Sequence, residues 1–286
     1  MLLTARAASA GSLPQPTAGT YCQSGQRLQH LNSARKDIMK IGVIGAGNIG
    51  SSVARNLSAA GHEVLVADAQ GVDAIRDKVK EAGATAVGLD QVVKGIDALI
   101  VSVPSIAIPE LAKQLGNVSP DITIIDTSNY YPFRDGAIED LQNGKPESQW
   151  VSEQFGHPVI KAFNAALAYT QEARGKPRGT PGRIALPVAG DDARGKAIAM
   201  QLVDDAGFDP VDAGSLAESW RQQPGTPAYC TELTRDELQK ALAQADKEKA
   251  PQQRETLISY FFEAGATLSH DDVIAKNRAG TAPGQA

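Results

Sequence analysis

Three glycines at a fixed spacing are the first residues of this sequence whose pattern suggests chemistry. The stretch IGVIGAGNIG, residues 41–50, contains G-x-G-x-x-G directly after a β-branched run and before an amphipathic segment. In that context the first glycine makes a tight turn, the second lets a pyrophosphate approach the backbone, and the third lets helix and strand pack closely. The pattern predicts a dinucleotide site at Gly45, Ala46, Gly47, Asn48, Ile49 and Gly50.

A carboxylate follows the next expected strand, in the stretch VLVADAQG of residues 64–71. Asp68 stands where a carboxylate accepts the two hydroxyls of an adenine ribose and repels a 2′-phosphate. The next residues are Ala69 and Gln70, and the nearest basic side chain is Arg76. This chemistry favours NAD as the cofactor and leaves NADP open, because Arg76 could swing toward a phosphate. The alternative for Asp68 is a solvated turn residue.

Further candidates follow later strands, and ligands of open parallel sheets bind beyond the carboxyl ends of the strands. Val103 and Pro104 end one apolar run, and Pro104 is either a wall for the nicotinamide ribose or only a strand terminator. Three substrate candidates follow the next run. Asn129 is expected to hydrogen-bond a carboxamide or substrate carbonyl, and Tyr130 and Tyr131 either stack on a planar ring or pack in the core.

Lys161 and Asn164 are the candidate catalytic residues, in the stretch VIKAFNA. They are similar in type to the lysine and asparagine of β-hydroxyacid dehydrogenases, although Lys161 lies in a strand-like run and could instead anchor a phosphate or form a salt bridge. His157, in a His-Pro pair, is read first as a surface turn. The sequence contains no Ser-His-Asp arrangement and no metal-spaced His/Cys cluster, so we expect no metal site.

This set of residues bears on the type of reaction. Reducing a carbonyl to an alcohol requires a proton donor beside the developing alkoxide, whereas passing hydride between nicotinamide and a flavin-like ring depends mainly on stacking and positioning. The sequence favours the second reaction. A dehydrogenase or imine reductase that uses Lys161 or His157 on a small metabolite is one alternative. A non-catalytic dinucleotide-binding module is the other.

The elements that must position these residues alternate in the manner of βαβ units. Continuous apolar strands followed by helical patterns indicate a parallel sheet covered on both faces, and so an α/β fold with a doubly wound Rossmann domain. A smaller α/β C-terminal unit and a helical tail follow. We expect a disordered or targeting extension over residues 1–38, a dinucleotide-binding domain over 39–157, a substrate or dimerisation unit over 158–275, and a disordered tail over 276–286.

The composition of the chain argues against some classes of binding partner. The chain has 28 basic and 33 acidic residues, a net charge of −5, and no dense basic run, which argues against a nucleic-acid partner. Its longest apolar run is too short to span a bilayer, and two cysteines, Cys22 and Cys230, suit a reducing compartment. We therefore expect a soluble cytoplasmic protein that acts on a small-molecule redox substrate.

The chain from Met39 to about Leu216 resembles the family of deazaflavin (coenzyme F420)-dependent NADP oxidoreductases and their bacterial dinucleotide-binding relatives. The shared stretches are MKIGVIGAGNIG, VSVP, IDTSNYYPFRDG, VIKAFNA and PVAGDDARGKA with GFDPVDAGSL. The resemblance implies a Rossmann domain with a small C-terminal unit, a homodimer, and F420 or a flavin as second substrate. Two features depart from the family: Asp68-Ala69-Gln70 where an Asn-Ser-Arg type segment binds the 2′-phosphate, and a longer, more polar chain beyond Ser215.

Overall fold

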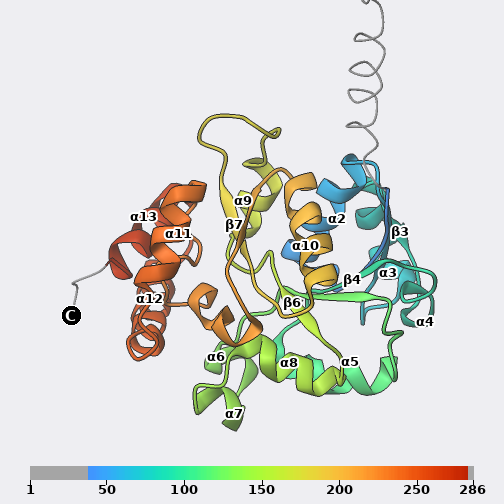
Figure 1. Cartoon of the computed structure of the whole chain (residues 1–286), viewed down its shortest axis with the longest axis horizontal. Coiled ribbons are helices and arrows are strands. Elements are labelled where there is room, and N and C mark those ends of the chain that lie inside the picture. The colour runs from blue at the N-terminus through green and yellow to red at the C-terminus, as the bar shows by residue number, and fades with distance from the viewer. Residues whose placement is uncertain (1–37, 283–286) are drawn as a thin grey trace, which may run out of the picture. The chain divides into compact units, whose positions relative to one another are not determined.

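The computed structural model describes residues 38–282, so the extension expected over residues 1–38 lies, apart from Ile38, outside the described residues. The core is a six-stranded parallel sheet with strand order β3-β2-β1-β4-β5-β6 (Figure 1). The chain builds one half of the sheet outward from β1 and then returns to build the other, which is the doubly wound order that the sequence predicted. The strands are β1 (Lys40–Ile44), β2 (Glu63–Ala67), β3 (Thr85–Ala86), β4 (Ala98–Val101), β5 (Thr123–Asp126) and β6 (Val159–Lys161).

Helices cover both faces of this sheet. The first part of the chain forms α2 (Asn48–Ala59), α3 (Val72–Glu81), α4 (Leu89–Val92), the 3₁₀ turn η1 (Ser105–Ala107), α5 (Ile108–Leu115), α6 (Pro132–Asp135), α7 (Glu139–Gln142) and α8 (Glu147–Phe155). The later part forms α9 (Ala168–Ala173), α10 (Ala193–Asp205), η2 (Leu216–Gln222), α11 (Arg235–Gln244), α12 (Ala250–Ala264), η3 (Gly265–Thr267) and α13 (His270–Gly280).

Two hydrophobic clusters lie on opposite faces of the sheet. On one face, apolar side chains of α2, α3 and α10 pack against Ile41 and Val43 of β1. On the other, side chains of α4, α5 and α8 pack against Ile44 of β1 and Leu99 of β4 (Figure 1). Burial of a large aliphatic side chain stabilises the fold by about 1.5–3 kcal/mol, so these two layers fix the strand ends that carry the candidate site.

A second sheet of two parallel strands, β7 (Ala185–Val188) and β8 (Asp209–Asp212), is connected by α10. The Asp192 side chain caps α10 by accepting hydrogen bonds from the backbone of Arg194 and Gly195. Side chains of α11 pack on this small sheet. A bridge between Lys161 and Ala189 joins it to β6 of the main sheet.

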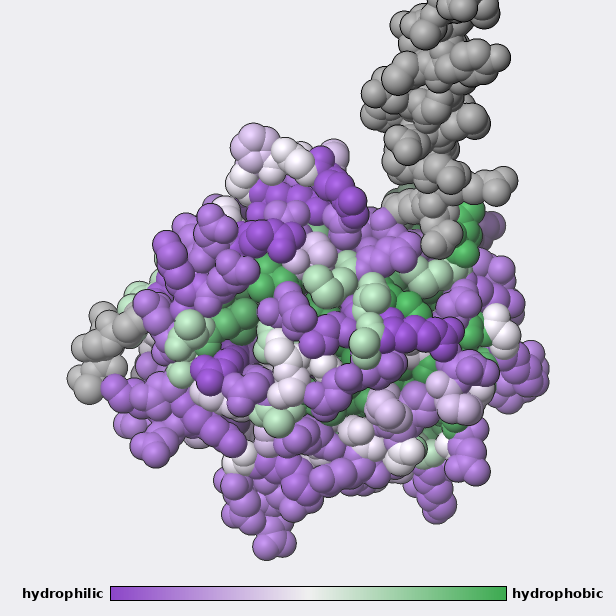
Figure 2. Space-filling model, in the orientation of Figure 1, coloured by the Kyte–Doolittle hydropathy of each residue, from purple (hydrophilic) through white to green (hydrophobic). Residues whose placement is uncertain are grey.

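The domain division at residues 157–158 stays a prediction. The sixth strand of the main sheet, β6, lies on the C-terminal side of that division, and residues from Ile38 onward form one compact unit. Figure 2 shows polar side chains over most of one face, with hydrophobic residues visible mainly in the hollows between them. Among the described residues, no helix has the length and apolar character needed to cross a membrane.

The structure differs from the sequence expectation at the C-terminal end, where we expected a disordered tail from residue 276. Residues 276–280 complete α13, and the Asn277 side chain is buried. Its amide donates a hydrogen bond to the backbone oxygen of Cys230, and the Arg278 guanidinium donates to the backbone oxygens of Thr231 and Glu232. These polar contacts, which hydrophobic periodicity does not reveal, hold the last helical turn in place.

Candidate functional site

The glycine motif forms a tight loop between β1 and α2. Gly45 has a φ angle of 106°, and a Cβ atom there would lie 2.2 Å from the backbone oxygen of Ser102. A Cβ atom at Gly50 would lie 2.0 Å from the backbone oxygen of Gly45. Both positions therefore require glycine, because any side chain would overlap backbone atoms that cannot move aside. This is the tight turn and the close helix–strand packing that the sequence predicted.

The absence of a side chain at Gly47 matters for a different reason. Its φ angle of −66° is open to every residue type, and nothing lies within 4 Å of the Cβ position. That open space lies at the first turn of α2, where free N–H groups and the helix dipole attract an anion. The loop thus leaves a space for a pyrophosphate, and a side chain at residue 47 would fill that space. The residues present therefore fit a dinucleotide.

Asp68 lies one residue beyond β2 and faces this loop. Its Oδ2 accepts a hydrogen bond of 2.7 Å from the backbone N–H of Ala46, and its Oδ1 accepts one of 3.0 Å from the N–H of Gln70. Lys78 of α3, which the sequence analysis did not single out, donates to the backbone oxygen of Ala46 at 2.6 Å. Arg76 forms an exposed ion pair with Asp73. The loop is therefore bordered by one carboxylate and one ammonium group.

A single cleft of about 280 Å³ extends from the loop over the carboxyl ends of β4 and β5. Eight residues that were selected from the sequence line it, namely Gly47, Asn48, Ile49, Val103, Pro104, Asn129, Tyr131 and Asn164. Other residues that were not selected from the sequence also line it, among them Arg134, Leu167, Tyr229 and Cys230. The cleft joins the glycine loop to the candidate substrate residues, which come from strands far apart in the sequence.

The two tyrosines expected to face a substrate ring lie in different surroundings. Tyr130 belongs to the core, where it is 2% exposed and donates its hydroxyl to the backbone oxygen of Gly136. It is therefore a packing residue, since alternate residues of an extended segment face opposite sides. Tyr131 lines the cleft, and the Arg134 guanidinium carbon lies 5.3 Å from the centre of its ring.

The Tyr131 hydroxyl lies 2.7 Å from the hydroxyl of Tyr229, so the two share a hydrogen bond. Burial raises the pKa of both phenols above their ordinary value of 10.0, and for Tyr229 the increase is large. Burial also raises the pKa of the neighbouring Cys230 thiol to about 12. All three groups are therefore neutral and protonated at pH 7.

Asn129 and Asn164 meet across the cleft. Asn129 Nδ2 donates to the backbone oxygen of Asn164, and Asn164 Nδ2 donates to Asn129 Oδ1 and to the backbone oxygen of Gln222. The Gln222 amide in turn donates to Asn164 Oδ1 at 3.0 Å. These contacts use both N–H groups of Asn164, whereas the Asn129 amide retains one for a ligand. Asn164 braces the cleft and Asn129 is the better placed of the two to contact a substrate.

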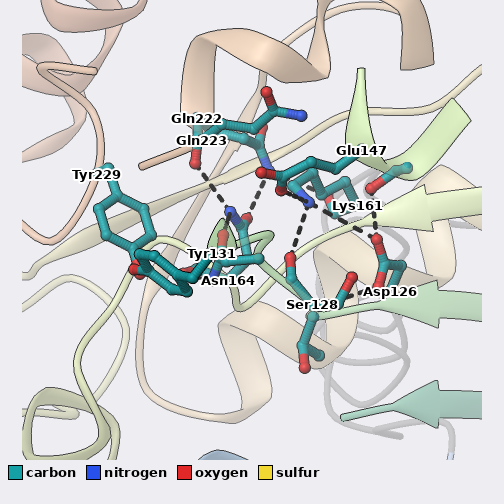
Figure 3. A network of polar contacts seen from close by, with 12 residues as sticks. Asp126, Ser128, Tyr131, Glu147, Lys161, Asn164, Gln222, Gln223 and Tyr229 are labelled. Atoms are coloured by element: carbon teal, nitrogen blue, oxygen red, sulfur yellow. Dashed lines mark hydrogen bonds and ion pairs between the residues drawn. The ribbon is translucent and has the colours of Figure 1, made fainter. Parts of the chain in front are cut away.

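Lys161 does not line the cleft. Its side chain is fully buried, and Nζ donates to the backbone oxygen of Ser128 at 2.9 Å and to Glu147 Oε2 at 3.2 Å (Figure 3). Asp126 Oδ2 lies 3.6 Å from the same nitrogen and accepts a hydrogen bond from the Ser148 hydroxyl. The salt-bridge interpretation of Lys161 is thus the correct one, because the ammonium group is enclosed by protein acceptors rather than directed toward a substrate.

The surroundings of Lys161 change the pKa of the Glu147 carboxyl group. Burial raises the pKa of Glu147, against the opposing effect of the Lys161 charge, and the neighbouring Asp126 charge raises it further. One lysine cannot compensate two buried carboxylates, so Glu147 gains a proton more readily than an exposed glutamate. The network fixes Ser128, which lines the cleft, and so shapes the site without reacting in it.

His157 lies at the amino end of β6, whereas the cleft lies beyond the carboxyl ends of the strands. Its ring nitrogens contact the backbone oxygens of Pro158 and Ser119, and it lines a separate cavity together with Arg194. The turn interpretation from the sequence agrees with this position. His157 therefore lies at the opposite end of the strands from the glycine loop and cannot deliver a proton to a ligand bound there.

Comparison with known proteins finds relatives of this chain. The family model described as NADP oxidoreductase, coenzyme F420-dependent, matches residues 40–130, from β1 to Tyr130. The YjhV protein of Escherichia coli K12 is 43% identical over 102 residues, which are 36% of this chain and 74% of that protein. Metalloreductase STEAP3 of Rattus norvegicus is 26% identical over 195 residues, 66% of this chain, and the chain spans only 36% of that protein.

Among solved structures, the hypothetical protein SMa0349 from Sinorhizobium meliloti superposes with a TM-score of 0.61 at 28% identity. The match covers 73% of this chain and all of that protein. It therefore covers a larger part of this chain than the family model does. The chain belongs to the family of coenzyme F420-dependent NADP oxidoreductases and is an NAD(P)-dependent oxidoreductase.

Proposed function

We propose that the protein transfers hydride between a nicotinamide dinucleotide and a flavin-like (deazaflavin) or other small redox partner. The observation that carries this proposal is the single cleft that runs from Gly47 on the glycine loop to Asn129 and Tyr131 beyond β5. A dinucleotide and a planar acceptor must lie together for hydride to pass, and a continuous cleft allows this. Family membership supports the same reaction class.

The chain's own groups account for dinucleotide binding. The N–H groups at the start of α2 bind the pyrophosphate over Gly47, and Val103 with Pro104 forms the wall of the cleft next to the loop. Bound there, a reduced nicotinamide supplies a hydrogen together with its electron pair. Pro104 removes one N–H donor from this wall, which keeps it apolar and limits the entry of water.

The cofactor is proposed to be NAD. The Asp68 carboxylate borders the glycine loop through Ala46 and suits the hydroxyls of an adenine ribose better than a 2′-phosphate. Lys78 is the residue that favours the opposite choice, because its ammonium group reaches the same loop. Arg76 is less suitable, since Asp73 already neutralises it at an exposed position.

The second half of the cleft suits a planar, weakly polar acceptor. The Tyr131 ring lines the cleft and offers an aromatic face, and the remaining N–H of Asn129 offers one hydrogen bond to a ring nitrogen or carbonyl. Asn164 and Gln222 keep Asn129 in position through the amide contacts between them. Stacking and one directed hydrogen bond orient a ring without covalent chemistry by the protein.

Two alternatives from the sequence are less well supported. A metabolite dehydrogenase or imine reductase that uses Lys161 or His157 as proton carrier conflicts with the enclosure of the first and the position of the second. A non-catalytic dinucleotide-binding module needs no second half of the cleft, yet polar and aromatic groups are built into it. A homodimer and a cytoplasmic location stay predictions.

The test is oxidation of NADH and NADPH by the purified protein with deazariboflavin, riboflavin and quinone acceptors. Steady turnover with at least one acceptor is expected, and it is expected to disappear in a Gly47→Val variant whose melting temperature is unchanged. Tight NADH binding without turnover on any acceptor would instead support the binding module.

A further inference from the structure

Two tyrosines that are 98 residues apart in the sequence meet in the cleft. Tyr131 follows β5, and Tyr229 lies in the segment between η2 and α11. Both line the cleft, and their hydroxyl oxygens are 2.7 Å apart (Figure 3). The proposed function uses the ring of Tyr131 and leaves both hydroxyls without a role.

The hydroxyl pair has a proton to give. Two phenols joined by one hydrogen bond carry two protons and use only one between them. The Cys230 thiol is a further hydrogen-bond partner of the Tyr229 hydroxyl. When Tyr229 donates to Tyr131, the Tyr131 proton is left to point to an acceptor in the cleft. Both phenols are protonated at pH 7, because their pKa values lie above the ordinary value of 10.0.

Contacts on both sides hold the pair in position. The Tyr131 backbone N–H donates to Asp135 Oδ2 at 2.9 Å, and Arg134, which is paired with Asp135, lies against the Tyr131 ring. On the other side, Cys230 has a φ angle of 54°, in the left-handed region, and its N–H donates to the backbone oxygen of Ala165. This strained residue fixes the direction of the chain directly after Tyr229.

We propose that the Tyr131–Tyr229 pair is the proton donor of the cleft, so that the protein delivers a proton together with the hydride. This rests on the proposed function. The acceptor gains the hydride with its electron pair, and a negative charge develops on one of its nitrogen or oxygen atoms. One phenol O–H bond breaks, and the proton forms a bond to that charged atom. The phenolate then regains a proton from water through the hydroxyl of its partner. The substrate class is therefore a neutral conjugated C=N or C=O compound, which takes up hydride and proton.

The pair is suited to this step because it is preorganised. A donor held within hydrogen-bond reach of the developing charge contributes about 10²–10⁴-fold to the rate. The hydrogen bond from one phenol also stabilises the phenolate that forms on the other, because a charged acceptor makes the stronger hydrogen bond. Neither Lys161 nor His157, the earlier candidates, reaches the cleft in this way.

The test compares two acceptors that differ in their need for a proton. Deazariboflavin is neutral and takes up hydride and proton, whereas N-methylacridinium is a cation and takes up hydride alone. In the Tyr131→Phe/Tyr229→Phe double variant, kcat with deazariboflavin is expected to fall about 10²–10⁴-fold. With N-methylacridinium, kcat is expected to stay within about threefold, because the chemistry of the hydroxyls is not needed.

Controls separate chemistry from structure. Tyr260→Phe on α12, outside the cleft lining, is expected to leave both activities unchanged. Equal losses with the two acceptors would show that the hydroxyls only support the site, and no loss with either would exclude them as donors. If the wild type oxidises NADH with neither acceptor, the proposed function fails and this inference fails with it. If the double variant does not fold, the single variants Tyr131→Phe and Tyr229→Phe are compared in the same way.

A second measurement does not depend on turnover. The near-ultraviolet absorbance of tyrosinate, followed as pH is raised, is expected to reveal two phenols in the wild type that ionise above the ordinary tyrosine range. Both ionisations are expected to be absent from the double variant and present in the Tyr260→Phe variant. Ionisation of these phenols in the ordinary range would contradict the buried, hydrogen-bonded pair on which the inference rests, because both hydroxyls would then be exposed to water.

Discussion

The Asn277 side chain of α13 donates a hydrogen bond of 3.3 Å to the backbone oxygen of Cys230, which lies 47 residues earlier in the sequence. Cys230 lines the cleft, and the adjacent Tyr229 carries one of the two tyrosine hydroxyls that meet there. The last helix of the described chain is thereby connected to the candidate site. A side chain of this helix thus contacts Cys230, whose φ angle lies in the left-handed region.

Replacement of Asn277 by alanine is expected to lower the free energy of unfolding by about 1–3 kcal/mol, because a buried carbonyl loses its donor. Urea denaturation followed by circular dichroism measures the change. The exposed neighbour Ala279 is a matched control, and Ala279→Ser is expected to change stability by less than about 0.5 kcal/mol. Equal stability of Asn277→Ala and the wild type would show that the contact contributes nothing.

Gly47→Val and Gly50→Val are expected to behave differently. The Cβ atom at residue 47 enters open space, so the fold survives and dinucleotide binding is lost, since the side chain occupies the place of the pyrophosphate. The Cβ atom at residue 50 overlaps the Gly45 carbonyl, so that variant is expected to lose stability by about 1–3 kcal/mol or more. Titration of NADH fluorescence and thermal melts of both proteins check the prediction. Normal NADH binding by Gly47→Val would contradict it.

The cofactor preference depends on Asp68. A carboxylate facing a 2′-phosphate, together with unpaired polar groups, costs on the order of 2–4 kcal/mol, or roughly 30- to 800-fold in preference for NADH. The double variant Asp68→Asn/Gln70→Arg removes the repulsion and adds a planar donor, so it is expected to shift toward NADPH. The measurement is kcat/KM for both cofactors with one acceptor. The substitution Lys78→Ala, made in the wild type and in the double variant, serves as the control.

A wild type that prefers NADPH would refute the assignment of Asp68. In that case Lys78→Ala is expected to lower kcat/KM for NADPH more than for NADH, because the ammonium group on the glycine loop would be the phosphate ligand.

Glu147 makes stability depend on pH. Burial raises its pKa in the folded protein above the ordinary value of 4.5, so the folded state holds this proton more tightly than the unfolded state. The stability that this difference contributes is present below pH 4.5 and is lost as pH rises through the folded pKa, at most about 1.4 kcal/mol per pH unit. Lys161 and Asp126 are the charged groups that face it.

Glu147→Gln removes this titration and keeps an oxygen to accept from Lys161. We expect the wild type to lose stability relative to the variant as pH is raised above 4.5, measured as the difference in unfolding free energy at several pH values. Parallel curves for the two proteins would contradict the raised pKa. Glu153→Gln, at an exposed position on the same helix, is the matched control.

The residue pattern alone was enough for the doubly wound fold, the glycine loop and much of the cleft wall. The reason is that these features depend on local rules: a hydrophobic period, a positive φ angle at Gly45, and the convergence of parallel strand ends that brings Pro104, Asn129 and Asn164 to one edge.

Tertiary structure decided what the residues at that edge can do. Tyr131 faces the cleft and Tyr130 the core because of one alternation in an extended segment, and Tyr229 joins Tyr131 from 98 residues away. Lys161 became a buried ion-pair partner because β5 and α8 brought Asp126 and Glu147 to it. Such roles depend on which side chains meet through folding, and residues that are neighbours in space but distant in sequence leave no periodic signal along the chain.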